Sequence, residues 1–564
     1  LTAGFLEQTG WSVSVVPFKE LTVESVRTAL WVLFGTVGLV LLIAGANVAN
    51  LYLVRAESRQ REVAVRSALG AGKRRLGMAF LSESVVLAVA GGVLGVAFAA
   101  AGVGLLVANG PAELPRLHEV RIDGVVLAFA LLLSVLISVL LALVPLARYA
   151  GVSYASLLRE GGRGNTASRE RHRARKVLIT AQVALALMLL VGSGLMLRSI
   201  ARLRSVDPGF RADGVLTVAV SLGGAERERA TPFYQRVLDA IHAVPGVDAV
   251  GATNSLPLQP SGYNGSSFDI ESQPRAEDAL PPFGYYAVVT PGFLEAIDVP
   301  LLAGRLPERR DHEGGQPVIW VNELLASTFL GGAADALGER VRFGSDSVYA
   351  DVVGVVGGVR MFGLREEVWP MAYMPMTTSN PHVSLEVMQF AIHTRGDPAS
   401  LVGPVRQAVQ RVDPAVPLTS ARTMDEVLAA SLAEMAFTTT LLGIAAIVAL
   451  LLGVIGLYGV ISYVVGQRTQ EIGVRMALGA RPDDVRGMVL RDGLGVTLAG
   501  VGLGLLGAAA ASRLLASLLF GVSARDPITF IAVALLLSSV SLLATWLPAR
   551  RAAAVDPIIA LRSD

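Results

Sequence analysis

The 564-residue sequence contains no cysteine, few charged side chains and few aromatic ones. The lack of cysteine excludes disulfide bonds, thiolate metal sites and cysteine nucleophiles, although it is compatible with either redox compartment. Charged residues make up 17% of the chain, against about 25% in ordinary soluble domains. A wholly soluble protein is therefore not expected. The net charge of +2 provides no broad basic field, so nucleic acid is not expected as a partner.

Long uncharged stretches take the place of the missing charges. There are seven, each long enough to cross a bilayer as a helix, which needs about 20 apolar residues. They are 28–54, 84–112, 124–147, 177–197, 435–467, 493–512 and 527–549. The sequence thus predicts an α-helical polytopic membrane protein with seven spans.

The polar block 198–434 is long enough to form a core of its own. Hydrophobic residues recur at helical spacing from Phe233 to Val244 and from Val402 to Val412, whereas 247–253 and 352–356 resemble strands. These patterns predict a large α/β domain outside the membrane.

The distribution of Lys and Arg predicts the orientation, because cytoplasmic loops retain these residues. Loops 55–83, 148–176 and 468–492 and the tail 550–564 are rich in them, whereas 113–123 and 513–526 carry two each. The C-terminus is therefore expected in the cytoplasm and block 198–434 on the opposite side. The basic run Arg163–Lys176 fits a solvated flank of a span, with anionic membrane lipid as an additional partner.

An internal repeat connects the two ends of the chain. Arg59–Ala71 reads RQREVAVRSALGA and Arg468–Ala480 reads RTQEIGVRMALGA, at an offset of 409 residues. Gly91 and Gly95 fall on Gly500 and Gly504 at the same offset, and Asp123 falls on Asp526 at an offset of 403. Each copy has a basic segment after one span, followed by two more spans. We interpret the chain as a three-span remnant followed by a complete four-span unit.

The repeated basic segments predict short cytoplasmic helices. Glu62 and Arg66, like Glu471 and Arg475, stand four residues apart with the acid first, which favours a helical ion pair. An Ala-Leu-Gly-Ala run then ends each helix at a glycine. Such a segment is either a docking element or a span end held by snorkelling arginines. Its duplication at matched positions favours docking.

The matched GxxxG pairs allow close helix approach in lipid, either within the span bundle or at a dimer face. No charged residue lies inside the uncharged stretches, which argues against a proton- or sodium-coupled carrier. The histidines show no metal-ligand spacing, and Asp311-His312-Glu313 lies in a polar, Gly-rich segment that we expect to be a turn. Neither a metal site nor a catalytic site is predicted.

These motifs together resemble a known family. The pattern E-(I/V)-x-V-R-x-A-L-G-A after a span and the terminal Pro548–Pro557 run, PARRAAAVDP, resemble the FtsX-like permease domain of the MacB family of ABC transporters. Segments VDPGF, LLAGR and VVGVVG within the polar block resemble the MacB periplasmic core domain. The duplicated layout is similar to the long acidobacterial (ADOP) type permeases. The first copy departs from the terminal pattern, reading Ser153-Tyr154 where the second has Asp556-Pro557.

The resemblance implies a domain order and an N-terminally incomplete chain, with one span and one outside domain expected before Leu1. The expected parts are 1–27 as the end of a first extracytoplasmic domain, 28–160 as the first FtsX-like domain, 161–176 as a basic linker, 177–197 as a span, 198–434 as the periplasmic core-like domain and 435–564 as the second FtsX-like domain.

In that family the helix after the second span of each unit rests on an ATPase subunit. By position, the implied ATPase-coupling residues are Arg59, Glu62, Val65, Arg66, Ala68, Leu69 and Gly70 in one copy, and Arg468, Glu471, Val474, Arg475, Ala477, Leu478 and Gly479 in the other. A cytoplasmic ABC ATPase is thus the expected partner, and a periplasmic adaptor is a further candidate.

The chain is not expected to be an enzyme itself. A Walker A loop requires G-x-x-x-x-G-K-[ST]; at the nearest approach, Gly72-Lys73, Ser67 replaces the first glycine and Arg74 the Ser/Thr. ATP and Mg²⁺ are therefore expected on the partner, with no cofactor on this chain. The leading hypothesis is a bacterial inner-membrane permease subunit that couples ATP hydrolysis to movement of the outside domain for export or extraction of a substrate. The alternatives are a non-transporting mechanotransmitter that controls a cell-wall hydrolase and a membrane-anchored sensor or scaffold without an ATPase.

Overall fold

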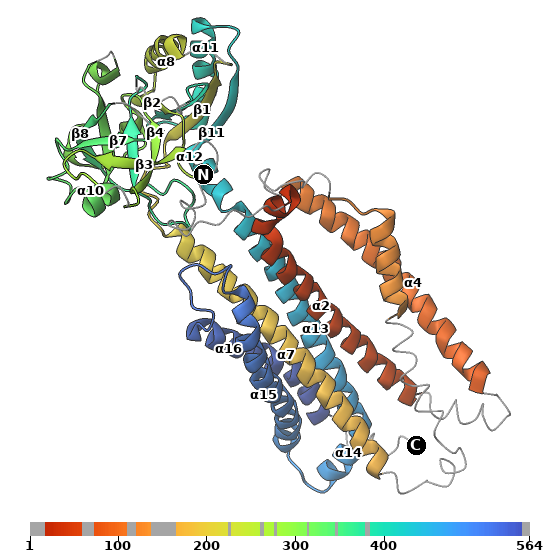
Figure 1. Cartoon of the computed structure of the whole chain (residues 1–564). Coiled ribbons are helices and arrows are strands. Elements are labelled where there is room, and N and C mark those ends of the chain that lie inside the picture. Colours follow the sequence, from red (N-terminus) through yellow and green to blue (C-terminus); the bar gives the residue numbers. More distant parts are fainter. Residues whose placement is uncertain are drawn as a thin grey trace. The chain divides into compact units, whose positions relative to one another are not determined.

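The computed structural model describes residues 17–58, 73–109, 120–136, 165–223, 227–259, 264–275, 279–312, 315–344, 348–377 and 384–554. The chain divides into an α/β unit, residues 203–433, and a helical unit, residues 16–202 with 434–564. Figure 1 shows both kinds of structure. The prediction of membrane-length helices together with a large α/β domain is confirmed.

The helical unit is built from long apolar helices. They are α2 (Phe18–Ser58), α4 (Lys73–Asn109), α7 (Asn165–Arg204), α13 (Ala433–Gln467), α15 (Pro482–Leu515) and α16 (Pro527–Ala553), with the short α14 (Thr469–Ala477) between α13 and α15. Within the described residues, six of these helices contain segments long and apolar enough to cross a membrane. The seventh expected span, 124–147, is described only as the apolar helix Gly124–Leu136. Its remaining residues lie outside the described part of the chain.

Corresponding aspartates begin the last helix of each repeat. The Asp526 carboxylate accepts a hydrogen bond from the Thr529 backbone N–H at 2.9 Å at the start of α16. Asp123 accepts one from the Val126 N–H at 2.8 Å at the start of helix Gly124–Leu136. An aspartate at this position satisfies a backbone donor that has no partner within the helix. The two copies therefore share this local geometry as well as sequence.

Two groups of helices pack within the unit. Close approach of α7 and α15 is possible because Gly500 and Gly504 have no side chains: a Cβ at Gly500 would lie 2.6 Å from Val183 Cβ, and one at Gly504 would lie 2.9 Å from Leu187 Cβ. By contrast, a Cβ at Gly91 or Gly95 meets no described atom within 4 Å. A second cluster joins α2, α7 and α13, which run alongside one another (Figure 1).

The α/β unit contains two sheets. The antiparallel sheet has the order β11-β1-β10-β2. The mixed sheet has the order β5-β8-β6-β9-β4-β3-β7, and a further pairing of β8 with β7 closes six of its strands into a ring. The strands of the first sheet are β1 (Val215–Ser221), β2 (Ala249–Thr253), β10 (Val387–His393) and β11 (Leu418–Thr423). Those of the second are β3 (Asn264–Ile270), β4 (Phe283–Val288), β5 (Leu301–Gly304), β6 (Val318–Asn322), β7 (Arg340–Phe343), β8 (Ala350–Val356) and β9 (Met371–Met374).

Helices cover these sheets and complete one apolar core. They are α8 (Arg227–His242), α9 (Phe293–Ala296), α10 (Glu323–Phe329), α11 (Val402–Val412) and α12 (Met424–Ser431), with the 3-10 helices η2 (Arg309–His312) and η3 (Pro398–Leu401). The core holds fully buried aromatic side chains from both sheets, among them Phe268, Phe343 and Phe390. Strands at 247–253 and 352–356 and helices around Phe233 and Val405 are as predicted. Val244 lies beyond the end of α8.

Candidate functional site

The described copy of the repeated basic segment forms the helix that its sequence predicts. Arg475 Nη2 lies 2.5 Å from Glu471 Oε1, four residues earlier in α14. Beyond α14, the Gly479 backbone has φ = 99° and the Ala480 N–H donates to the Arg475 carbonyl at 3.0 Å. A left-handed glycine with this backward hydrogen bond is a common way to end a helix.

One face of α14 is anchored in the span bundle. Ile472 is 1% exposed and belongs to a core cluster with Ile179 of α7 and Val485 and Val489 of α15. One turn further on the same side, Arg475 Nη1 lies 3.2 Å from the sulfur of Met488 of α15. Because Ile472 belongs to a cluster built from α7, α13, α15 and α16, displacement of α14 would be transmitted to several spans.

Charged side chains add to this anchoring. Asp492 of α15 lies 3.5 Å from Lys176 of α7 and 3.7 Å from Arg468, which directly precedes α14. These side chains are about half exposed, and exposed ion pairs each contribute only about 0–1 kcal/mol. They therefore orient the end of α13 against its neighbours more than they stabilise it.

The opposite face of α14 is open. Val474 is 43% exposed and Leu478, directly after the helix, is 83% exposed. Ala477 and Gly479 are exposed beside them. A large exposed aliphatic side chain next to other exposed apolar groups is typical of a surface that binds another protein or lipid. This arrangement gives an anchored helix with an exposed ion pair and an exposed apolar tip, suited to contact another protein.

The seven corresponding residues of the first copy, Arg59 to Gly70, lie outside the described residues. Their role, like that of the described copy, stays a prediction. Two anchoring residues were not among the predicted site residues. Asp492 could have been found as the acidic residue directly before stretch 493–512, and Ile472 as the apolar position one turn before Arg475 on the same side of the helix.

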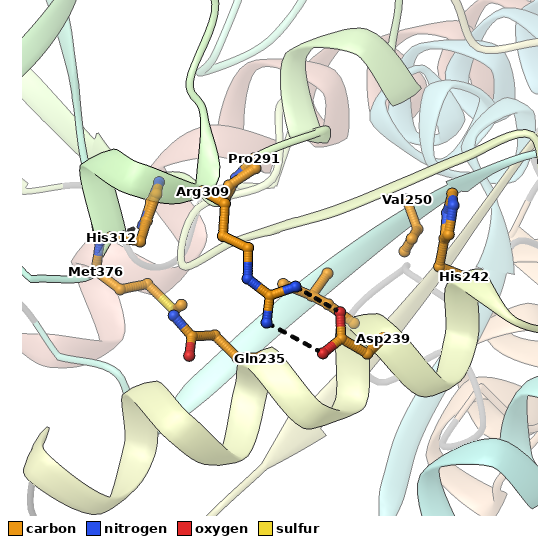
Figure 2. A pocket seen from close by; sticks show the side chains of 9 residues that line it. Gln235, Asp239, His242, Val250, Pro291, Arg309, His312 and Met376 are labelled. Carbon is orange, nitrogen blue, oxygen red and sulfur yellow. Dashed lines mark hydrogen bonds and ion pairs between the residues drawn. The ribbon is translucent and has the colours of Figure 1, made fainter.

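The α/β unit has a separate hollow of about 160 Å³ between α8, η2 and the chain after β9 (Figure 2). Arg309 of η2 reaches Asp239 of α8, with nitrogen to oxygen distances of 3.5 Å. Beside it, the Met376 N–H donates to Nδ1 of His312 at 3.3 Å, and burial lowers the pKa of His312 to about 4. The imidazole is therefore neutral near pH 7, with its remaining proton on Nε2.

The segment around His312 differs from the polar turn that its sequence predicts. Asp311 and His312 lie in η2, and His312 is only 2% exposed. Asp311 makes a bidentate pair with Arg305, with both distances 2.6 Å. Burial alone would raise the pKa of Asp311, but hydrogen bonds from Arg305 and the Glu308 N–H, with the nearby positive charge, hold this pKa below its usual value. These residues hold a loop in place, and no group of metal-ligating side chains occurs among the described residues.

The fold and the repeated helix define a class: multi-span membrane proteins in which a helical bundle carries a large α/β domain inserted before its last three spans. Comparison with known families agrees with this class and identifies the families that the two parts of the chain resemble. The FtsX-like permease C-terminal family matches twice, at residues 34–153 and 443–557. The MacB-like periplasmic core domain matches residues 183–412. The chain thus combines two regions that match the FtsX-like permease family with one that matches the MacB-like periplasmic core domain, and the double FtsX-like match confirms the internal repeat.

Curated relatives carry the same assignment over part of their length. A macrolide export ATP-binding/permease protein MacB from Rhodospirillum rubrum is 31% identical over 293 residues, which are 49% of this chain and 42% of that protein. The protein of the same name from Hahella chejuensis is 36% identical over 127 residues, 22% of this chain and 19% of its own. The chain thus matches less than half the length of these relatives.

Two solved structures also match. The extracellular domain of the noncanonic ABC-type transporter YknZ from Gram-positive bacteria is 14% identical with a TM-score of 0.25, over 36% of this chain and all of that one. The periplasmic region of MacB from Actinobacillus actinomycetemcomitans is 10% identical with a TM-score of 0.27, over 40% of this chain and 94% of that one.

Proposed function

We propose that the chain is the transmembrane permease subunit of an ABC transporter complex of the mechanotransmission type. In this proposal, a separate cytoplasmic ATPase binds α14 and its counterpart around Arg59–Gly70. ATP hydrolysis moves the helical unit, and the helices carry that movement to the α/β domain on the other side of the inner membrane, for export or extraction of a substrate. The C-terminus is then cytoplasmic, and the chain crosses the membrane seven times.

The main observation in support of this proposal is that α14 has one buried side and one exposed side. Its buried Ile472 connects it to α7 and α15, while Leu478 is 83% exposed. A lever requires both a rigid attachment and a free contact surface. Arg475 beside this apolar tip provides a charged group that an acidic groove on an ATPase would pair with.

A photo-crosslinking amino acid at residue 478 tests the proposal in the native membrane. The expected product joins the full chain to a polypeptide that contains a Walker A motif. The control position is Ile455 of α13, which is 62% exposed along the apolar span and should contact lipid. Crosslinking to a Walker-containing protein from 478 and not from 455 supports the proposal.

The same experiment separates the alternatives. A sensor or scaffold predicts no ATPase product from residue 478, and this result would overturn the proposal. A mechanotransmitter predicts the ATPase product together with a cell-wall hydrolase bound to the α/β domain. ATP-dependent movement of a substrate in reconstituted vesicles then distinguishes export or extraction from control of a hydrolase.

A further inference from the structure

Polar side chains lie at one end of the apolar cluster that joins α2, α7 and α13. Asn47 of α2 is 9% exposed and Gln182 of α7 is fully buried. The Asn47 amide donates to the Leu452 carbonyl of α13 at 2.8 Å, and Gln182 Nε2 donates to Asn47 Oδ1 at 3.2 Å. Hydrogen bonds between helices in an apolar surrounding contribute to helix association.

The helices that these groups connect are equivalent members of the repeat. At the offset of 409 residues that aligns the two basic segments, Val40, Ile43 and Asn47 of α2 correspond to Ala449, Leu452 and Gly456 of α13. Both sets lie at the same contact. The apolar residues of the two sets, Val40, Ile43, Ala449 and Leu452, belong to one cluster, and Asn47 contacts Leu452 and Gly456. Contact between equivalent surfaces is the property of a twofold interface. The α2–α13 contact is therefore a pseudo-twofold contact formed inside one chain.

The contact is not symmetric at its polar position. A Cβ at Gly456 would overlap Asn47 Oδ1 and would lie 2.8 Å from Gln182 Oε1. The Asn47 side chain thus occupies the space that Gly456 leaves open. In a contact between two copies of α2, both positions would hold Asn and the amides would compete for one space. Between two copies of α13, both would hold Gly and no side chain would be there to make the hydrogen bond.

We propose that Asn47, Gly456 and Gln182 form a pairing determinant that selects the α2–α13 contact within one chain over contacts between equivalent helices of two chains. The determinant works as a knob and hole, with a hydrogen bond as its second component. Different residues at equivalent positions favour the mixed pair and disfavour both identical pairs. This inference concerns the assembly of the two repeats and holds whether or not an ATPase binds α14.

The absence of cysteine allows a direct test with the full chain. Val40→Cys and Ala449→Cys are introduced together, and a protease site is placed in the linker before Asn165. After oxidation in the membrane and cleavage, an intramolecular disulfide keeps the two fragments together on a non-reducing gel. Val40→Cys alone reports contact between two copies of α2 as a band of twice the chain mass. We expect the fragments to stay linked and the single variant to give no such band.

Substitutions at the polar position then test the determinant itself. Gly456→Asn should lower the intramolecular crosslink at least fivefold, because two Asn side chains meet. Exchange of both residues, N47G/G456N, should restore at least half of the crosslink, since one Asn again faces one Gly and Gln182 Oε1 is free to accept from the new amide. The matched control is Gly459→Asn on the same helix, where a Cβ meets no described atom within 4 Å.

Two results would overturn the proposal. One is a dominant band of twice the chain mass from Val40→Cys alone, because it would show that two copies of α2 pair even though Asn47, Gly456 and Gln182 are all unchanged. The other is an exchanged variant that crosslinks no better than Gly456→Asn. Size-exclusion chromatography in detergent identifies a misfolded variant, and in that case the Val40→Cys result decides alone.

Discussion

The close packing of α7 on α15 makes a quantitative prediction for Gly500→Ala. The new Cβ would lie 2.6 Å from Val183 Cβ and 2.9 Å from the Thr180 carbonyl oxygen, whereas carbon atoms pack best at about 3.5–4.0 Å. Because a backbone oxygen is one of the obstacles, the helices must separate. Overpacking of this kind costs about 1–3 kcal/mol.

Gly502→Ala is the matched control on the same helix, since its Cβ meets no described atom within 4 Å. Both substitutions gain roughly 1 kcal/mol of helix propensity, so this gain cancels in the comparison. We expect Gly500→Ala to be less stable than Gly502→Ala by about 1–3 kcal/mol. The assay is thermal unfolding of the full chain in detergent, with the midpoint read from loss of the monodisperse peak. Equal midpoints for the two variants would refute the packing argument.

Three further predictions concern single residues. His312 has a folded pKa of about 4, below its ordinary 6.5, so its contribution is complete above about pH 6.5 and is lost as the pH falls toward 4; the hydrogen-exchange protection factors in strand β6, each referred to the intrinsic exchange rate at the same pH, should fall over that range by an amount reflecting about 3 kcal/mol, and a shallower dependence is expected in His312→Gln. Asp311→Asn breaks the partly buried pair with Arg305 and should destabilise the α/β domain by about 1.5–3 kcal/mol, measured by the same exchange at pH 7; unchanged exchange would contradict it. Asp526→Ala removes the cap of α16 and should cost about 0.5–2 kcal/mol, visible as faster exchange in the first turn of α16 and not in α15.

The sequence predicted the elements whose signals are local. The helix at α14 follows from the Glu471–Arg475 spacing and the glycine after it, because both act within one or two turns. The α/β strands and helices follow from their hydrophobic periodicity. The start of α15 at Pro482, ahead of stretch 493–512, shows where that reasoning stops. An uncharged stretch measures the apolar part of a helix, whereas the proline and the two aspartates after it favour the true beginning.

Features that depend on which helices become neighbours could not be predicted. Asn47 and Gln182 are ordinary polar residues in two apolar stretches until α2 and α7 are placed side by side. His312 is likewise buried against a distant segment, in which the Met376 N–H, 64 residues away, donates to its ring. In the same way, the exposed tip of α14 is recognisable from sequence only as a small apolar run. Its exposure is set by the direction in which Ile472 is buried.

The central claim is that α14 and its counterpart transmit ATP hydrolysis to the spans. The most direct test is the rate of ATP hydrolysis by the partner ATPase, reconstituted with the full chain carrying Arg66→Glu and Arg475→Glu. Each reversal removes a charged contact worth about 1.5–3 kcal/mol. The swapped pair E471R/R475E, which keeps the helical ion pair, separates loss of contact from loss of helix stability. Arg406→Glu, on exposed α11 surface, is the control.

The account predicts that R66E/R475E lowers both co-purification of the ATPase and stimulated hydrolysis about tenfold or more, while Arg406→Glu leaves both unchanged. Wild-type stimulation in the doubly reversed variant would contradict it.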